Sequence, residues 1–204
     1  MNLRERDISV PSQNISGYIN DVMNPKQGDT CHEYVANIQV DSMKMEGSFT
    51  VFLFAGPFDE HDPSAWYDEK SLIGAHGFFS GPESMGDGSA LVNAGATITD
   101  SLLMNKAGGL LDDLTHGAVT AFLKKCIEWR IVKSDGTILD EDDVPGLEVA
   151  IMTAEVKVSG YKHQLPSWGA FKPLKDITSG RKHGFGWKGD VQVGGDLEFG
   201  VSIG

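Results

Sequence analysis

The sequence predicts a mainly β protein, an antiparallel β-sandwich or barrel of about seven or more strands with one or two short helices. Apolar residues alternate with polar ones over several short stretches, which is typical of half-buried strands. Glycine accounts for 25 of the 204 residues, and without a repeat period it indicates many tight turns between short strands. Hydrophobic residues make up 40% and charged residues 23%, enough for a core and without a disorder signature.

The length of 204 residues fits one domain, and we divide residues 1–204 into three parts. Residues 1–31 form an N-terminal helical extension, because apolar residues recur at helical spacing over residues 12–23. Residues 32–160 form the β core. Residues 161–204 are a tail rich in glycine and aromatic residues that completes the fold.

Each strand of the core is predicted from its own pattern. Residues 34–40 have a period of two, with Tyr34, Ala36, Ile38 and Val40 on one side, and predict a half-buried strand. Residues 47–56 are apolar on both sides and predict a strand in the middle of a sheet. Asp100 begins a short helical turn, and Thr115–Lys125 carries apolar residues on one side and predicts a helix. The remaining predicted strands are residues 72–79, 90–99 (a weaker pattern), 127–132, 147–158 and 190–203.

Charge and cysteine content restrict the partners and the location. The net charge of −12 and the pI of about 4.8 disfavour nucleic acid and membrane partners, because phosphate backbones and anionic lipids repel such a surface. No apolar run approaches the roughly 20 residues that a membrane helix needs, and no signal-peptide pattern follows Met1. Cys31 and Cys126 form no disulfide framework, and Cys126 is expected to be a small core residue. We therefore expect a cytoplasmic protein.

The sequence contains no catalytic constellation that can be defended. No two of its six histidines stand three to five residues apart, so no helix presents a pair to a metal ion. The acidic run at residues 140–143 is the kind that forms a solvated loop. We therefore predict no catalytic residues, no metal site, no cofactor and no enzyme activity of its own.

Aromatic residues beside glycines in the tail allow two interpretations. Trp168, Phe185 and Trp187 could stack on a sugar, which would make the chain a lectin-like module that binds carbohydrate or another ligand. Alternatively, these side chains attach a long terminal segment to the core. The sequence does not decide between them.

The order of several short motifs resembles the C-terminal domain of fungal tyrosinases (polyphenol oxidases). His32 to Val40 resembles the opening strand, which ends in V-N-I-x-V, and Gly47 to Phe54 resembles G-S-F-x-V-x-x-F. Asp62 to Trp66 is similar to the loop motif D-P-S-x-W. Further similarities are Leu72 to Gly74 with L-[VI]-G, Leu123 to Arg130 with L-x-K-x-L-x-W-R, Asp135-Gly136 with D-G, and Val144 to Val149 with P-x-L-x-V.

The resemblance implies a β-sandwich-like lid that packs over the dicopper site of a separate catalytic domain, keeps the proenzyme latent and is removed by proteolysis. In several members an aromatic side chain shortly before a C-x-x-C motif projects into the substrate pocket. That position points to Phe79, then Phe78, and Trp66 of the loop motif is a third candidate contact. Residues 84–93 contain no cysteine, so the copper-loading role of C-x-x-C does not carry over.

These observations give one leading hypothesis and its alternatives. The chain is expected to bind, shield or regulate a tyrosinase catalytic domain without catalysing a reaction itself. It is either a free-standing protein or the excised lid of a longer proenzyme. A homo-oligomer is a further expectation, and the carbohydrate-binding module is the alternative function.

Overall fold

The computed structural model describes residues 30–80, 88–159 and 164–187. The helix predicted over residues 12–23 and the strand predicted over residues 190–203 lie outside these ranges. Within them no helix is both long and apolar enough to cross a membrane.

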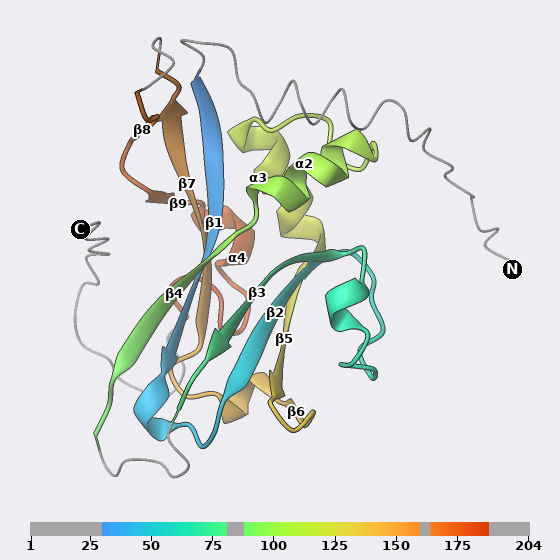
Figure 1. Ribbon diagram of the computed structural model, residues 1–204, viewed down its shortest axis with the longest axis vertical. Coiled ribbons are helices and arrows are strands. Elements are labelled where there is room, and N and C mark those ends of the chain that lie inside the picture. Colours follow the sequence, from blue (N-terminus) through green and yellow to red (C-terminus); the bar gives the residue numbers. More distant parts are fainter. Residues whose placement is uncertain (1–29, 81–87, 160–163, 188–204) are drawn as a thin grey trace, which may run out of the picture.

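Nine strands build the described part of the chain, and short helices connect or cover them (Figure 1). The strands are β1 (Thr30–Asp41), β2 (Phe49–Ala55), β3 (Leu72–Phe78), β4 (Leu91–Thr97), β5 (Ile127–Lys133), β6 (Ile138–Leu139), β7 (Glu148–Lys157), β8 (Ser167–Trp168) and β9 (Lys172–Pro173). The α-helices are α2 (Thr99–Ala107), α3 (His116–Cys126) and α4 (Lys175–Thr178), and the 3-10 helices are η1 (Ser42–Lys44), η2 (Trp66–Asp68) and η3 (Glu141–Asp143).

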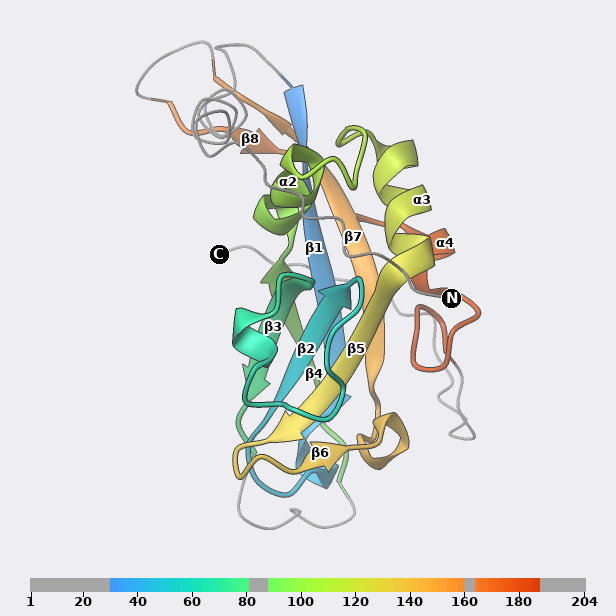
Figure 2. The ribbon, with the colours of Figure 1, turned by 90° about the vertical axis from the view of Figure 1, so that its right-hand side faces the viewer.

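The strands form two antiparallel sheets, which confirms the predicted fold class. The first has the order β4-β1-β7-β8, with β9 also paired to β7, and the second has the order β3-β2-β5-β6. Figure 2 shows β2, β3 and β5 in front of the long strands β1 and β7. Helices α2 and α3 lie together at one end of the sheets, and η1 and β6 lie at the other end (Figure 1).

The main core lies between the two sheets, because alternate residues of their strands point toward each other. On β1 the even-numbered residues Tyr34, Ala36, Ile38 and Val40 are fully buried. They share one cluster with Val51 and Leu53 of β2, Ile131 of β5 and Ile151 of β7. The alternation predicted for residues 34–40 therefore marks the inner face of β1.

A second apolar cluster covers the outer face of β2, so the prediction that this strand is buried on both sides is confirmed. Its members, which we call the outer aromatic cluster, are Phe52, Phe54, Trp66 and Val132, with Phe58, Leu72 and Ala75 packed against them. The acidic segment of residues 57–70 lies over β2 and contributes Phe58 and Trp66. One contiguous loop therefore closes this side of the sandwich.

Both helical segments that were predicted within the described residues are present. Thr115 caps α3, because its hydroxyl accepts from the backbone N–H of Ala118, while Val119 and Leu123 are buried. Helix α2 extends to Ala107, further than the short turn that the sequence predicted, and Asp100 lies in its first turn rather than at its N-cap. There its negative charge is favourable next to the N-terminal end of the helix dipole.

Candidate functional site

Phe78 and Phe79 stand at the end of β3, and their side chains have opposite environments. Phe78 pairs with Phe49 across the β2–β3 ladder, and the two rings stack with centroids 5.2 Å apart. Phe78 is only 5% exposed, whereas Phe79 is 89% exposed. Phe78 is therefore a core residue, so its predicted role as a partner contact does not fit the structure, and Phe79 is the one that presents an aromatic ring to solvent.

The residue after Phe79 is anchored to the turn that follows β1. The Ser80 hydroxyl lies 2.9 Å from the carbonyl oxygen of Ser42 and 2.6 Å from that of Met45. Because β3 precedes Phe79 and these hydrogen bonds follow it, the backbone on both sides of the exposed ring is held. Because the backbone is already held, binding through this ring costs less conformational entropy than binding that must also order a loop.

Asp41 organises the same end of the sandwich from the last position of β1. Its carboxylate accepts from the Ser89 hydroxyl at 2.6 Å, the Ala90 N–H at 3.0 Å and the Met43 N–H at 3.3 Å, and Lys44 Nζ lies 3.6 Å away. Burial alone would raise the pKa of the Asp41 carboxyl, but these hydrogen bonds and Lys44 outweigh it and hold the pKa below its ordinary value. Asp41 thus remains charged and ties Ser89 and Ala90 to the turn that also holds Ser80.

Trp66 has a structural role instead of the predicted contact role. It has no exposed surface, and its ring meets those of Phe52 and Phe54 edge-on, with centroids 5.3 and 5.8 Å apart. Its indole N–H donates to the carbonyl oxygen of Asp59 at 2.7 Å, as a buried indole nitrogen requires. A side chain without exposed surface cannot contact a partner, so Trp66 instead holds the acidic loop on the sheet.

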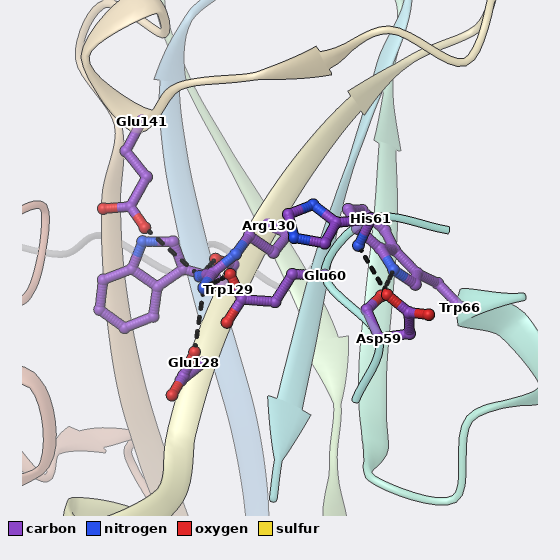
Figure 3. A network of polar contacts seen from close by, with 8 residues as sticks. All are labelled: Asp59, Glu60, His61, Trp66, Glu128, Trp129, Arg130 and Glu141. Atoms are coloured by element: carbon purple, nitrogen blue, oxygen red, sulfur yellow. Dashed lines mark hydrogen bonds and ion pairs between the residues drawn. The ribbon is translucent and has the colours of Figure 1, made fainter. Parts of the chain in front are cut away.

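Arg130 of β5 fastens the other side of that loop (Figure 3). One guanidinium nitrogen lies 3.1 Å from both Glu60 and Glu128, and the other lies 3.9 Å from Glu141. The guanidinium also lies 5.4 Å from the centre of the Phe58 ring, a cation–π distance. Burial raises the pKa of the Glu141 carboxyl despite the nearby His183 and Arg130. Arg130 thus joins the acidic loop to η3 across the outer face of the sheet.

The three tail aromatics do not form one platform. Trp168 pairs with Val156 near one end of β7, whereas Gly184, beside Phe185, bridges to Val149 near the other end. Seven residues of strand separate these points, which is about 23 Å and too far for one sugar ring. Trp168 also donates to Glu33, and Lys175 lies 5.4 Å from the centre of the Phe185 ring. The interpretation that these residues attach the tail fits this arrangement better than a sugar platform.

His183 is a tail residue that no sequence pattern had selected. It is buried, with Nε2 3.0 Å from Asp142 and Nδ1 3.3 Å from the carbonyl oxygen of Leu147. Its φ is +56°, which is uncommon for a residue other than glycine. At the next position a Cβ would lie 1.9 Å from the carbonyl oxygen of Thr178, so only glycine fits at Gly184. His183 and Gly184 thus secure the tail against β7.

No group of three histidine, cysteine or acidic side chains that could hold a metal ion occurs in the described ranges. Cys126 is half-buried, its thiol donates to the carbonyl oxygen of Phe122 at 3.2 Å, and burial raises its pKa. It packs against the main core and borders a hollow of about 410 Å³ beside Phe58 and Glu128. A thiol with a raised pKa is a poor nucleophile and metal ligand.

Residues 33–151 match the tyrosinase C-terminal domain family. The chain belongs to this family. It is 24% identical over 163 residues to a tyrosinase of Neurospora crassa, a match that covers 76% of this chain and 23% of that protein. A shorter match, 40% identical over 42 residues, covers 21% of this chain and 7% of a tyrosinase of Podospora anserina. This tyrosinase C-terminal domain therefore spans less than a quarter of the length of either relative.

Solved structures of mushroom tyrosinase share the fold of this tyrosinase C-terminal domain. A structure of latent and active mushroom tyrosinase superimposes with a TM-score of 0.55 at 12% identity, over 86% of this chain and 31% of that one. A recombinant mushroom tyrosinase gives a TM-score of 0.52 at 13% identity, over 74% of this chain and 26% of that one. At these identities the likeness concerns the fold.

Proposed function

We propose that this tyrosinase C-terminal domain is a non-catalytic binding module that docks on a tyrosinase catalytic domain and shields its dicopper site. Family membership supports a tyrosinase catalytic domain as the partner, because the C-terminal domain is the non-catalytic part of tyrosinases. The observation that carries the proposal is the exposed ring of Phe79 on a rigid base. This residue occupies the position that the family resemblance assigns to the aromatic side chain that enters the substrate pocket.

The surroundings of Phe79 suit a shielding contact. The ring is apolar and reaches out from an end of the sandwich where Leu91 and Val92 are also partly exposed. Its backbone is held by β3, and Ser80 is held by the carbonyl oxygens of Ser42 and Met45. Exposed aromatic residues on fixed backbone are the usual anchors of protein interfaces. Phe79 is therefore the contact that we expect to matter most for docking.

Inhibition of a tyrosinase tests the proposal. The chain is titrated into the catalytic part of the Neurospora crassa tyrosinase, prepared without its C-terminal portion, and monophenol oxidation is measured. Inhibition should rise to a plateau as the chain is added. The Phe79→Ala variant should require at least about tenfold more protein for the same inhibition, since loss of an anchor costs about 1.4 kcal/mol or more.

Leu165→Ala is the matched control. Leu165 is 84% exposed and lies in the segment before β8, so its truncation removes a similar amount of exposed apolar surface elsewhere. It should inhibit as the unaltered chain does. Unchanged oxidation at a large excess of the chain would overturn the shielding function. Equal inhibition by the Phe79→Ala variant would instead exclude Phe79 as the anchor.

A further inference from the structure

Strand β4 is an edge of its sheet, and its outward backbone groups can be identified from two hydrogen bonds. The N–H of Ile98 donates to the carbonyl oxygen of Tyr34, and the N–H of Ser42 donates to that of Ala90, each at 3.0 Å. In an antiparallel ladder alternate residues bond to the same neighbour. Even-numbered residues of β4 therefore bond to β1, while Leu91, Asn93, Gly95 and Thr97 direct their N–H and C=O groups away from it.

Part of this edge is covered by β3. A Cβ placed on Gly74 would lie 3.4 Å from the Cβ of Ala96 and 3.3 Å from a methyl group of Ile98, so the two sheets approach closely there. Among the described strands, β1 alone is hydrogen-bonded to β4. Within the part of the chain that the structure describes, Leu91–Gly95 lies beyond this close approach and has no second strand paired to it, and we call this stretch the β4 edge.

The β4 edge lacks the devices that usually prevent strand addition. Natural edge strands carry charges, prolines or bulges that block pairing with another chain. Residues 88–99 include neither a charged residue nor a proline, and the pairing of β1 with β4 runs without a register shift. The net charge of −12 repels a second copy overall, and the residues of this edge add no charge to that repulsion.

The side chains along the β4 edge are complementary to themselves. A second copy placed antiparallel about Asn93 sets Leu91 opposite Gly95 on the outer face, so that the larger side chain meets a residue without one. The two Asn93 side chains then stand side by side. Asn93 Oδ1 accepts from the Asn37 amide at 3.3 Å, and the Asn93 amide N–H groups can donate to the second copy. On the inner face Val92 meets Ala94. Leu91, Asn93 and Gly95 are also the residues whose backbone groups point outward.

We propose that the β4 edge is an interface at which a second copy of this chain adds its own β4, so that two sheets become one continuous antiparallel sheet. Stable interfaces bury about 1,200–2,000 Å² in total, and pairing of five residues buries much less. The association is therefore weak. The chain is monomeric at low micromolar concentration and pairs at hundreds of micromolar, and added salt favours pairing because it screens the net negative charge.

Sedimentation velocity over roughly 5 to 1,000 µM, at low and high salt, measures this association. The Asn93→Pro variant removes one outward N–H and leaves the bonds to β1 intact, since those come from even-numbered residues. It should stay monomeric over the whole range. Asn93→Lys, which places two positive charges together at the two-fold axis, should weaken pairing at least about tenfold. Asn93→Ala keeps the N–H and should still pair.

Three results would overturn the proposal. The first is that the chain stays monomeric in high salt even at roughly 1,000 µM, the highest concentration measured, where even a weak contact of this size should form. The second is a dimer that both Asn93→Pro and Asn93→Lys leave unchanged, which would place the interface elsewhere. The third is strong protection of the Leu91 and Asn93 amides from hydrogen exchange in dilute protein, which would mean that another segment of the same chain occupies the edge.

Discussion

The two sides of the sheet that contains β2 are both buried, but they are built in different ways. The inner side packs against β1 and β7, whose residues come from distant parts of the chain. The outer side is covered by one loop, residues 57–70, which brings its own aromatic rings and is fastened by Trp66 and Arg130. Equal burial therefore does not mean equal cooperativity. The inner core should unfold only with the whole domain, whereas the outer aromatic cluster can open locally.

Leu53→Ala should cause the largest loss of stability. Leu53 is fully buried between the sheets, and Leu→Ala in a core that cannot collapse costs about 3 kcal/mol. Chemical denaturation followed by far-ultraviolet circular dichroism measures the change. The midpoint should fall while the transition stays single. A second transition would show that the inner core is not one cooperative unit.

Trp66→Ala should lower the free energy of unfolding by up to about 2–3 kcal/mol. The loss is smaller than at a rigid core site, because the loop can detach and no cavity has to be kept. The distinguishing readout is limited proteolysis, which should cut within residues 57–70 faster than in the unaltered chain. Leu53→Ala is the comparison, since it should raise cleavage there no more than elsewhere. Cleavage that is no faster at this loop would contradict local opening.

High pH should destabilise the inner core, because Tyr34 ionises there. Burial, with a smaller contribution from Asp113, raises the pKa of Tyr34 from its ordinary 10.0 to about 12. Because the folded-state pKa is the higher one, its stabilising effect is complete below pH 10 and is lost as the pH rises from about 10 to 12. The loss is at most about 2.7 kcal/mol.

Tyr34→Phe separates this effect from the titration of other groups. The variant loses the hydrogen bond from the hydroxyl to the carbonyl oxygen of Leu114, 2.8 Å long, which costs about 1 kcal/mol near neutral pH. Between pH 10 and 12 its free energy of unfolding should fall less steeply than that of the unaltered chain. Parallel curves from the two proteins would exclude Tyr34 as the cause.

Arg130→Lys should have the smallest effect, about 1 kcal/mol, and only on the outer side. Lysine keeps the charge but lacks the planar fork that reaches Glu60, Glu128 and Glu141 together. The partners Glu60 and Glu128 are largely exposed, so each ion pair is weak. Hydrogen exchange should increase in residues 57–70 and stay unchanged in β1 and β7. Increased exchange in β1 would contradict the separation of the two sides.

The sequence predicted the inner face of β1 well, because alternation shows directly which residues share a face. It predicted β2 from apolar residues on both of its faces, but not what covers its outer side. An aromatic residue in an acidic loop has the same pattern whether it points to solvent or to the sheet. Trp66, which the sequence made a candidate partner contact, points to the sheet. Periodicity also could not detect β6, β8 and β9, since two residues are too short to show a period.

The candidate site was predicted in part. The family resemblance selected Phe78 and Phe79, and only the β2–β3 register, which stacks Phe78 on Phe49, distinguishes the buried residue from the exposed one. Asp41 was missed, although an aspartate at the end of a strand is a frequent turn residue. Its partners Ser89 and Ala90 lie almost fifty positions away, and one sequence carries no sign of such a contact.

The anchoring of Ser80 and Ser89 to one turn has a consequence for the backbone beside Phe79. Ser80 and Ser89 are each fixed by hydrogen bonds to residues 41–45, so both flanks of the segment between them are held by the same turn. The family resemblance implies a C-x-x-C motif near this segment, and this chain has no cysteine there. The turn after β1 thus fixes the backbone next to the exposed ring of Phe79 through contacts that lie outside the segment between Ser80 and Ser89.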